Sequence, residues 1–291
     1  AMPARGGNLR QKLSTAAFSF LLLVIAESAS IAHAEPIVPA DYKLVWSDEF
    51  DVDGLPDETK WAYDIDHNRQ GWFNNEKQYY AERRRENARV EKGNLVIEAR
   101  ADAAEISKLP DWGRQQFSSA RLRTLGKASW TYGAVEVRAK IPCGRGTWPA
   151  IWMLADDKIT PWPDSGEIDI MEHVGFDPGK VHFSLHTKNG NFITHTETTA
   201  VKSVATACTE MHRYQLRWTP SLIVMGVDDQ RGFSFKRPTL KRADWPFDGP
   251  FHILLNIAIG GDWGGQKGID PNALPARMEI DYVRVYQKSG S

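Results

Sequence analysis

Short runs of alternating apolar and polar residues recur along the chain, and a period of two is typical of half-buried β-strands. In residues 131–142, Val135, Val137 and Ala139 alternate with charged side chains. Similar runs occupy residues 94–100, 148–154, 214–218, 222–227, 251–259 and 277–286. Gly, Pro, Asn or Asp residues separate these runs. The pattern therefore predicts many short strands that are joined by turns.

Many short strands with almost no helix predict an all-β protein, either an antiparallel sandwich or a barrel. The charged stretch at residues 74–88 is the one segment that could form a helix. No internal repeat, low-complexity tract or linker interrupts the chain after residue 40. We therefore expect a single domain over residues 35–291.

Residues 1–34 have the three parts of a secretory signal peptide. Three basic residues precede an apolar stretch at 13–26, and residues 32–34 read Ala-His-Ala, a small-x-small cleavage site. The apolar stretch is too short to span a bilayer, which needs roughly 20 residues. We therefore expect the mature protein to be secreted, either extracellular or periplasmic, with no membrane partner after cleavage.

Composition narrows the range of partners. The 12 Phe, 11 Trp and 8 Tyr residues exclude an intrinsically disordered chain. The 36 basic and 37 acidic residues are interspersed and give a formal net charge of −1, which argues against a nucleic-acid partner. Because tryptophan stacks on sugar rings and other flat ligands, its abundance favours a ligand groove.

Both cysteines, Cys143 and Cys208, lie in the part of the chain that we expect to be exported. In an oxidising compartment they could form one disulfide bond. Two unpaired buried thiols are the alternative.

The strongest chemical signal is a group of three carboxylates in residues 165–175, SGEIDIMEHVG. Glu167 and Asp169 share one face of a regular strand, whereas Glu172 falls on the other. A β-bulge near residues 170–171 would add one residue and return Glu172 to the first face. The offset between the glutamates would then be roughly 13 Å at about 3.3 Å per residue. Side chains that lean together would approach the ~5–5.5 Å carboxyl separation of retaining glycosidases.

Two other interpretations of these carboxylates stay open. A regular strand would split Glu167 and Glu172 across the sheet as part of an acidic solvent face. A calcium site is the second, although three side chains along one strand cannot surround an ion that takes 6–8 oxygen ligands. In the catalytic interpretation, Asp169 would sit between the glutamates and tune their proton balance.

The run EIDIME at 167–172, with Trp162-Pro163 just before it, resembles the active-site strand of glycoside hydrolase family 16, and most closely that of the laminarinase-type endo-β-1,3-glucanases. Other segments resemble the family in family order, namely residues 44–50, 74–80, 120–154, 245–265 and 278–286. The resemblance covers practically the whole mature chain. It implies a β-jelly-roll sandwich of two antiparallel sheets, concanavalin-like, with a substrate cleft on its concave face.

Carried onto the matching positions, the resemblance implies Glu167 as the nucleophile, Glu172 as the acid/base and Asp169 as their hydrogen-bonded helper. It also places His186 near the subsites on either side of the cleaved bond, together with Asn75. His182, four residues before His186, shares its strand face, yet a zinc site would need a third ligand that the sequence does not place.

Four tryptophans are candidates for sugar platforms, namely Trp148, Trp152, Trp162 and Trp263. Trp148 and Trp152 share one strand face, which suits a cleft floor, and the glycines beside Trp263 would let a ligand approach. Each could instead be a core or rim aromatic residue. We expect Asn256 to be a hydrogen-bonded core residue and not a ligand contact.

Members of the resembled family often carry one structural calcium ion on the convex face. The matching ligands here would be Glu49, Gly93 and Asp281. An empty site or a salt bridge to a neighbouring arginine is the alternative.

The sequence therefore predicts a secreted, retaining endo-glycosidase that hydrolyses internal β-1,3-linkages of a laminarin-like β-glucan. We expect it to be a monomer whose partner is a polysaccharide, and to need no cofactor for catalysis. The same fold could act on mixed-linkage glucan, agarose, carrageenan or β-1,3-galactan, or could favour transglycosylation. A non-catalytic carbohydrate-binding protein is the other alternative, against which the three acids argue.

Overall fold

The computed structural model describes residues 35–290, so the expected signal peptide at 1–34 lies outside the described residues. Within the described range the chain forms seventeen strands, one short α-helix and two 3₁₀ turns. Two large antiparallel sheets hold most of the strands. The all-β prediction is therefore confirmed.

The larger sheet has the strand order β15 (Gln230–Lys236), β14 (Leu222–Val227), β13 (His212–Trp218), β8 (Gly133–Lys140), β17 (Ala276–Lys288), β5 (Asn94–Ala99) and β4 (Ala88–Glu91), with β1 (Tyr42–Asp48) also paired to β17. The smaller sheet has the order β12 (Thr198–Ser203), β11 (Lys180–His186), β10 (Glu167–Glu172), β9 (Thr147–Ala155), β16 (Phe251–Ile259), β7 (Arg121–Arg123) and β2 (Ala62–Tyr63). Sequential strands are often not neighbours, so the sheets assemble from distant parts of the chain.

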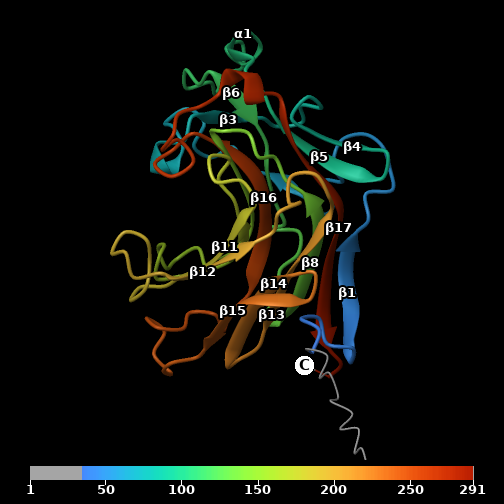
Figure 1. Cartoon of the computed structure of the whole chain (residues 1–291), viewed down its shortest axis with the longest axis vertical. Helices are drawn as coiled ribbons and strands as arrows, with labels where there is room; N and C mark the ends of the chain where they lie inside the picture. Colours follow the sequence, from blue (N-terminus) through green and yellow to red (C-terminus); the bar gives the residue numbers. More distant parts are fainter. Residues whose placement is uncertain (1–34, 291) are drawn as a thin grey trace, which may run out of the picture. The chain divides into compact units, whose positions relative to one another are not determined.

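The two sheets pack face to face because alternate residues of their strands are apolar. Ile151 and Met153 of β9 and Ile168 of β10 point inward from the smaller sheet, and each is fully buried. Val135 and Val137 of β8 meet them from the larger sheet in the same core. Burial of each such side chain contributes about 1.5–3 kcal/mol. In Figure 1, β11 and β16 lie on one side of this core and β8, β17 and β1 on the other.

The expected helix at residues 74–88 is wrong. The segment holds the 3₁₀ turn η1 (Phe73–Asn75) and the strand β3 (Gln78–Tyr80), which pairs in parallel with β6 (Phe117–Ser119). Asn74 and Arg83 take positive φ angles of 56° and 50°, which an α-helix does not tolerate. Consecutive buried residues in β3 also lack the spacing of a helix with one buried face. Within residues 35–290 the α-helix is α1 (Ala103–Ile106), and the second 3₁₀ turn is η2 (Pro271–Ala273).

Cys143 and Cys208 form a disulfide bond, with a Cα–Cα distance of 5.7 Å. The bond joins the loop between β8 and β9 to the loop between β12 and β13, and each of these loops crosses from one sheet to the other. The disulfide prediction is confirmed.

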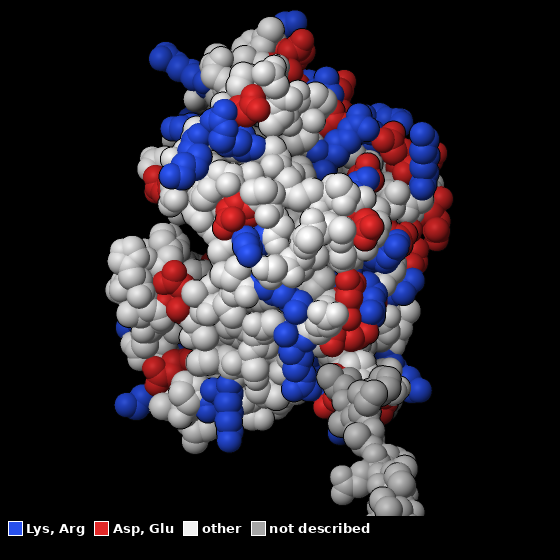
Figure 2. Space-filling view, viewed as in Figure 1, with Lys and Arg blue, Asp and Glu red and all other residues white. Residues whose placement is uncertain are grey.

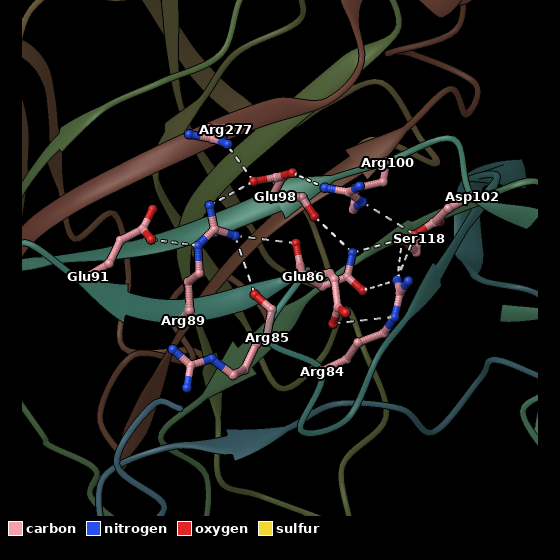
Figure 3. A network of polar contacts seen from close by, with 11 residues as sticks. Arg84, Arg85, Glu86, Arg89, Glu91, Glu98, Arg100, Asp102, Ser118 and Arg277 are labelled. Carbon is pink, nitrogen blue, oxygen red and sulfur yellow. Dashed lines mark hydrogen bonds and ion pairs between the residues drawn. The ribbon is translucent and has the colours of Figure 1, made fainter. Parts of the chain in front are cut away.

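The buried carboxylate of Glu98 connects three neighbouring strands of the larger sheet. The Glu98 side chain on β5 is 1% exposed and binds Arg89 of β4 and Arg277 of β17, each at 2.9 Å. Arg100 is a third partner, and Figure 3 shows the three guanidinium groups converging on Glu98. Because a buried charge is costly when it has no partner, the arginines make burial of Glu98 tolerable.

Charges of both signs are mixed over the face that is shown in Figure 2, without one large area of a single sign. In the part of the chain that the structure describes, no helix has the length and apolar character needed to cross a membrane.

Candidate active site

A β-bulge in β10 brings the three acids to one face of the smaller sheet. The pairing of β10 with β9 shifts by one residue between Asp169 and Met171. The extra residue, Ile170, is buried in the core with Met171, and it returns Glu172 to the face that carries Glu167 and Asp169. The predicted bulge is therefore confirmed, and the alternative that splits the glutamates across the sheet is wrong.

Glu167 and Glu172 both line a cavity of about 550 Å³ over this face. The strands β9, β10 and β16 form its floor, and the loop before β10 and the loop after β11 add walls. Its further lining residues include Phe73, Glu76, Arg121, Trp148, Trp152, Trp162, Phe192, Ile193 and Asn256. Aromatic walls with a few converging polar groups are typical of a ligand site.

Each catalytic candidate accepts a hydrogen bond from an indole. Trp162 Nε1 donates to Glu167 Oε2 at 2.6 Å, and Trp148 Nε1 donates to Glu172 Oε1 at 3.1 Å. Trp162 precedes β10 and Trp148 lies on β9, so the two donors reach the acids from different elements. Both tryptophans line the cavity, as expected, but they also orient the two carboxyl groups.

Asp169 lies between the two glutamates, and its side chain is 1% exposed. Burial raises the pKa of Asp169 well above its ordinary value, and the charges of Glu167 and Glu172 raise it further. The raised pKa favours the protonated form of Asp169, and a side-chain interaction with Glu167 contributes to the shift. Nε2 of His186 lies 3.0 Å from Oδ2 of Asp169, so His186 meets the acids directly.

Burial raises the pKa of Glu172 to about 8, and the nearby charge of Glu167 adds to this effect. The hydrogen bond from Trp148 acts in the opposite direction and lowers that pKa. A carboxyl group with a pKa near 8 is protonated at neutral pH, which is the state that a general acid needs. The indole N–H of Trp162 meanwhile stabilises negative charge on Glu167.

Trp152 lines the cavity but packs against other protein groups. The guanidinium of Arg121 lies 4.7 Å from the centre of its ring, and the same guanidinium lies 5.2 Å from Trp72. Trp152 Nε1 also donates to Asn256 Oδ1 at 2.8 Å. Arg121 thus covers one face of Trp152. Asn256 is hydrogen-bonded, as expected, but it also lines the cavity.

Trp263 sits beside the cavity and is not among the residues that line it. Its ring packs edge to face on Trp148 at 5.4 Å and on His182 at 4.8 Å. The adjacent Gly264 serves this packing, because a Cβ there would lie 2.5 Å from a backbone oxygen and 2.9 Å from Trp148. Asn75 is exposed and donates to Asp262 at 2.8 Å, outside the cavity lining.

Glu76 and Arg121 are among the cavity residues that the sequence analysis missed. Glu76 accepts hydrogen bonds from Asn74 and Gln78, both at 3.2 Å, and burial raises its pKa. Arg121 belongs to the short strand β7. Because residues 74–88 were expected to form a helix, Glu76 was not considered as a residue of the site. Arg121 alternates with apolar Leu122 in β7, so a period of two could have identified it as a cavity-facing residue.

Two of the three expected calcium ligands bind arginines instead. Arg284 donates two hydrogen bonds to Glu49, at 2.9 and 2.8 Å, and lowers the pKa of that carboxyl. Arg138 donates to Asp281 at 2.6 Å. Gly93 has a positive φ of 77° in the turn between β4 and β5. A calcium ion would have to displace both arginines, so these residues do not fit the ion as they stand.

A sandwich that carries two carboxyl groups on one face of a cleft, one of them protonated at neutral pH, defines a glycoside hydrolase of the two-carboxylate type. The chain belongs to the family Glycosyl hydrolases family 16, whose sequence profile matches residues 75–284. The prediction from the EIDIME run is therefore confirmed.

Individual relatives agree with this assignment. A beta-glucanase from Rhodothermus marinus is 50% identical over 277 residues, which cover 92% of this chain and 93% of that protein. The crystal structure of SCLam, a non-specific endo-beta-1,3(4)-glucanase, superposes with a TM-score of 0.84 at 51% identity and covers 87% of this chain and 94% of that one. The laminarinase from Rhodothermus marinus gives a TM-score of 0.79 at 50% identity, with 84% and 97% of the two chains covered.

Proposed function

We propose that this protein is a secreted, retaining endo-β-1,3-glucanase. The observation that carries the proposal is the pair Glu167 and Glu172, which line one cavity, together with the raised pKa of Glu172. The laminarinase and the beta-glucanase that resemble the chain at 50% identity support β-1,3-glucan as the substrate. The signal-like sequence of residues 1–34 supports secretion.

In the first step, Glu167 attacks the anomeric carbon while protonated Glu172 gives its proton to the leaving glycosidic oxygen. A covalent glycosyl-enzyme forms and the leaving-group sugar departs as an alcohol. In the second step, Glu172, now a carboxylate, takes a proton from water, and the water oxygen displaces Glu167 from the sugar. Two displacements at one carbon retain its configuration.

The neighbours of the two acids suit these roles. Trp162 donates to Glu167, which favours the negative form that attacks. The raised pKa of Asp169 favours its neutral form, which lies beside Glu167 without adding a third negative charge. Burial and the charge of Glu167 keep Glu172 protonated until the bond breaks. When Glu167 is bound to the sugar its charge disappears, so Glu172 releases its proton more readily.

A polysaccharide panel tests the substrate. We expect laminarin to give a mixture of short oligosaccharides early in the reaction, as internal cleavage requires. Mixed-linkage glucan belongs in the panel because SCLam is described as acting on 1,3(4)-linkages. Cleavage of agarose or carrageenan with laminarin left intact would overturn the specificity, and release of monosaccharide alone would overturn endo action.

Azide rescue tests the two roles separately. In Glu172→Ala, an aryl glycoside with a good leaving group still forms the intermediate, and azide should then release a β-glycosyl azide. In Glu167→Ala, azide that fills the vacated space should give the α-product. The opposite stereochemistry would exchange the two roles, and net inversion by the unmodified enzyme would refute the retaining mechanism.

A further inference from the structure

The acids of the candidate active site share their cavity face with a histidine from the next strand. His186 on β11 lies directly opposite Glu167 on β10. One imidazole nitrogen of His186 and one oxygen each of Glu167 and Asp169 all lie within 4.8 Å of one another. The zinc site that the sequence suggested paired His186 with His182, whereas the structure places two carboxylates of the neighbouring strand beside His186.

We propose that Glu167, Asp169 and His186 form a reversible, inhibitory site for a divalent transition-metal ion such as Zn²⁺. Zinc binds imidazole nitrogen and carboxylate oxygen, and three protein ligands leave a fourth position for water. Calcium and magnesium do not suit this set, because they prefer six or more oxygen ligands or waters and no imidazole.

The buried ligand atoms in this group are open to a further partner. Asp169 and His186 are 1% and 6% exposed. No described residue makes a well-aligned hydrogen bond to either carboxylate oxygen of Asp169. Glu167 accepts a bond from Trp162 at one oxygen and so keeps lone pairs for an ion. A divalent cation at this point would also be attracted to the negative charge of Glu167.

The surroundings of His186 indicate that the ion would be exchangeable. Nδ1 of His186 has no hydrogen-bond partner among the described residues. A histidine in a permanent metal site usually donates this second N–H to an acceptor, which fixes the ring and strengthens the ligand. Here aromatic packing holds the ring instead, with Trp162 at 5.9 Å and Phe192 at 5.7 Å.

An ion bound here would block the attack by Glu167, so binding and hydrolysis would exclude each other. The inhibition rests on the proposed function, whereas metal binding does not. Calorimetric titration of the whole protein with Zn²⁺ therefore tests the site independently of activity. We expect one Zn²⁺ per chain, no binding of Ca²⁺ or Mg²⁺, and competition by a β-1,3-glucan oligosaccharide.

Two histidine variants locate the ion. His186→Gln should weaken Zn²⁺ binding at least tenfold. His182→Gln is the matched control, because His182 lies four residues away on β11, opposite Glu172, and its Nε2 has no hydrogen-bond partner among the described residues. This control should bind Zn²⁺ as the unmodified protein does, and its hydrolysis of laminarin should be equally sensitive to Zn²⁺.

Unchanged binding in His186→Gln would overturn the site, as would equal loss in His182→Gln or the absence of Zn²⁺ binding in the unmodified protein. If His186→Gln does not fold, Glu167→Gln gives the same test, since it keeps the side-chain shape and removes a charged ligand. Zinc binding without any hydrolysis of laminarin would refute the proposed function and leave the metal site standing.

Discussion

The hydrogen bond from Trp148 to Glu172 should set the alkaline limit of activity. Trp148→Phe keeps an aromatic ring and removes the N–H that lies 3.1 Å from Glu172 Oε1. Because this bond lowers the pKa of Glu172, its loss should raise that pKa above the present value of about 8. A hydrogen bond to a charged group contributes about 1.5–3 kcal/mol. At about 1.36 kcal/mol per tenfold change in proton affinity, the lower end corresponds to about one pH unit.

The assay is the pH profile of kcat/KM on a soluble β-1,3-glucan, whose alkaline limb reports the general acid of the free enzyme. We expect the limb of Trp148→Phe to move upward by about one pH unit. Trp152→Phe is the matched control, since the N–H of Trp152 bonds to Asn256 and not to an acid. An unmoved limb, or one that moves down, would refute the argument that Trp148 tunes Glu172. An equal upward move in the control would refute it too.

Three further predictions concern stability and binding. Glu98→Ala should lower the free energy of unfolding by about 3 kcal/mol in urea titration, because three arginines lose their buried partner. Glu91→Ala is the control, because it removes only a partly exposed ion pair with Arg89, and it should lower the free energy of unfolding by less than about 1 kcal/mol. Reduction of Cys143–Cys208 should cost about 4 kcal/mol, the chain-entropy value for a separation of 65 residues, and an unchanged melting temperature would contradict it. Trp263→Ala should raise KM on laminarin by the equivalent of about 1–3 kcal/mol if its ring stacks on sugar, whereas unchanged kinetics would make it a rim residue.

The sequence pattern predicted seven strands of the two large sheets but missed others, among them β1, β12 and β15. Alternation in residues 131–142 predicted β8, and the other short apolar or alternating runs predicted β5, β9, β13, β14, β16 and β17 within a few residues. Alternation predicts a strand because one face of the strand must be buried. Hydrophobic side chains at every second position therefore allow only the register that buries them. The helix expected at residues 74–88 is wrong because burial decides the structure of that segment too. The composition of that segment suits a helix, but packing buries consecutive residues in β3 and overrides local preference.

The acids of the candidate site could be identified from the sequence because carboxylates inside an otherwise apolar strand are unusual and indicate a function. Glu167, Asp169 and Glu172 could be aligned by assuming one extra residue, and the bulge at Ile170 supplies it. Their neighbours were harder to assign. Trp152 was expected to offer an open face for sugar, but Arg121 covers one side of it. Arg121 arrives from β7, a strand that is distant in sequence, so no local pattern could reveal the contact.

The sequence by itself determined the all-β fold, the family and the three acids, since each depends on local alternation or on one contiguous motif. The tertiary structure alone decided which charges are buried and what they meet. It paired Glu49 and Asp281 with arginines, surrounded Glu98 with three guanidinium groups, and placed His186 against the acids of β10. The physical reason is that the energy of a charge depends on its neighbours and on its exclusion from water, and both are set by segments that meet only when the sheets assemble.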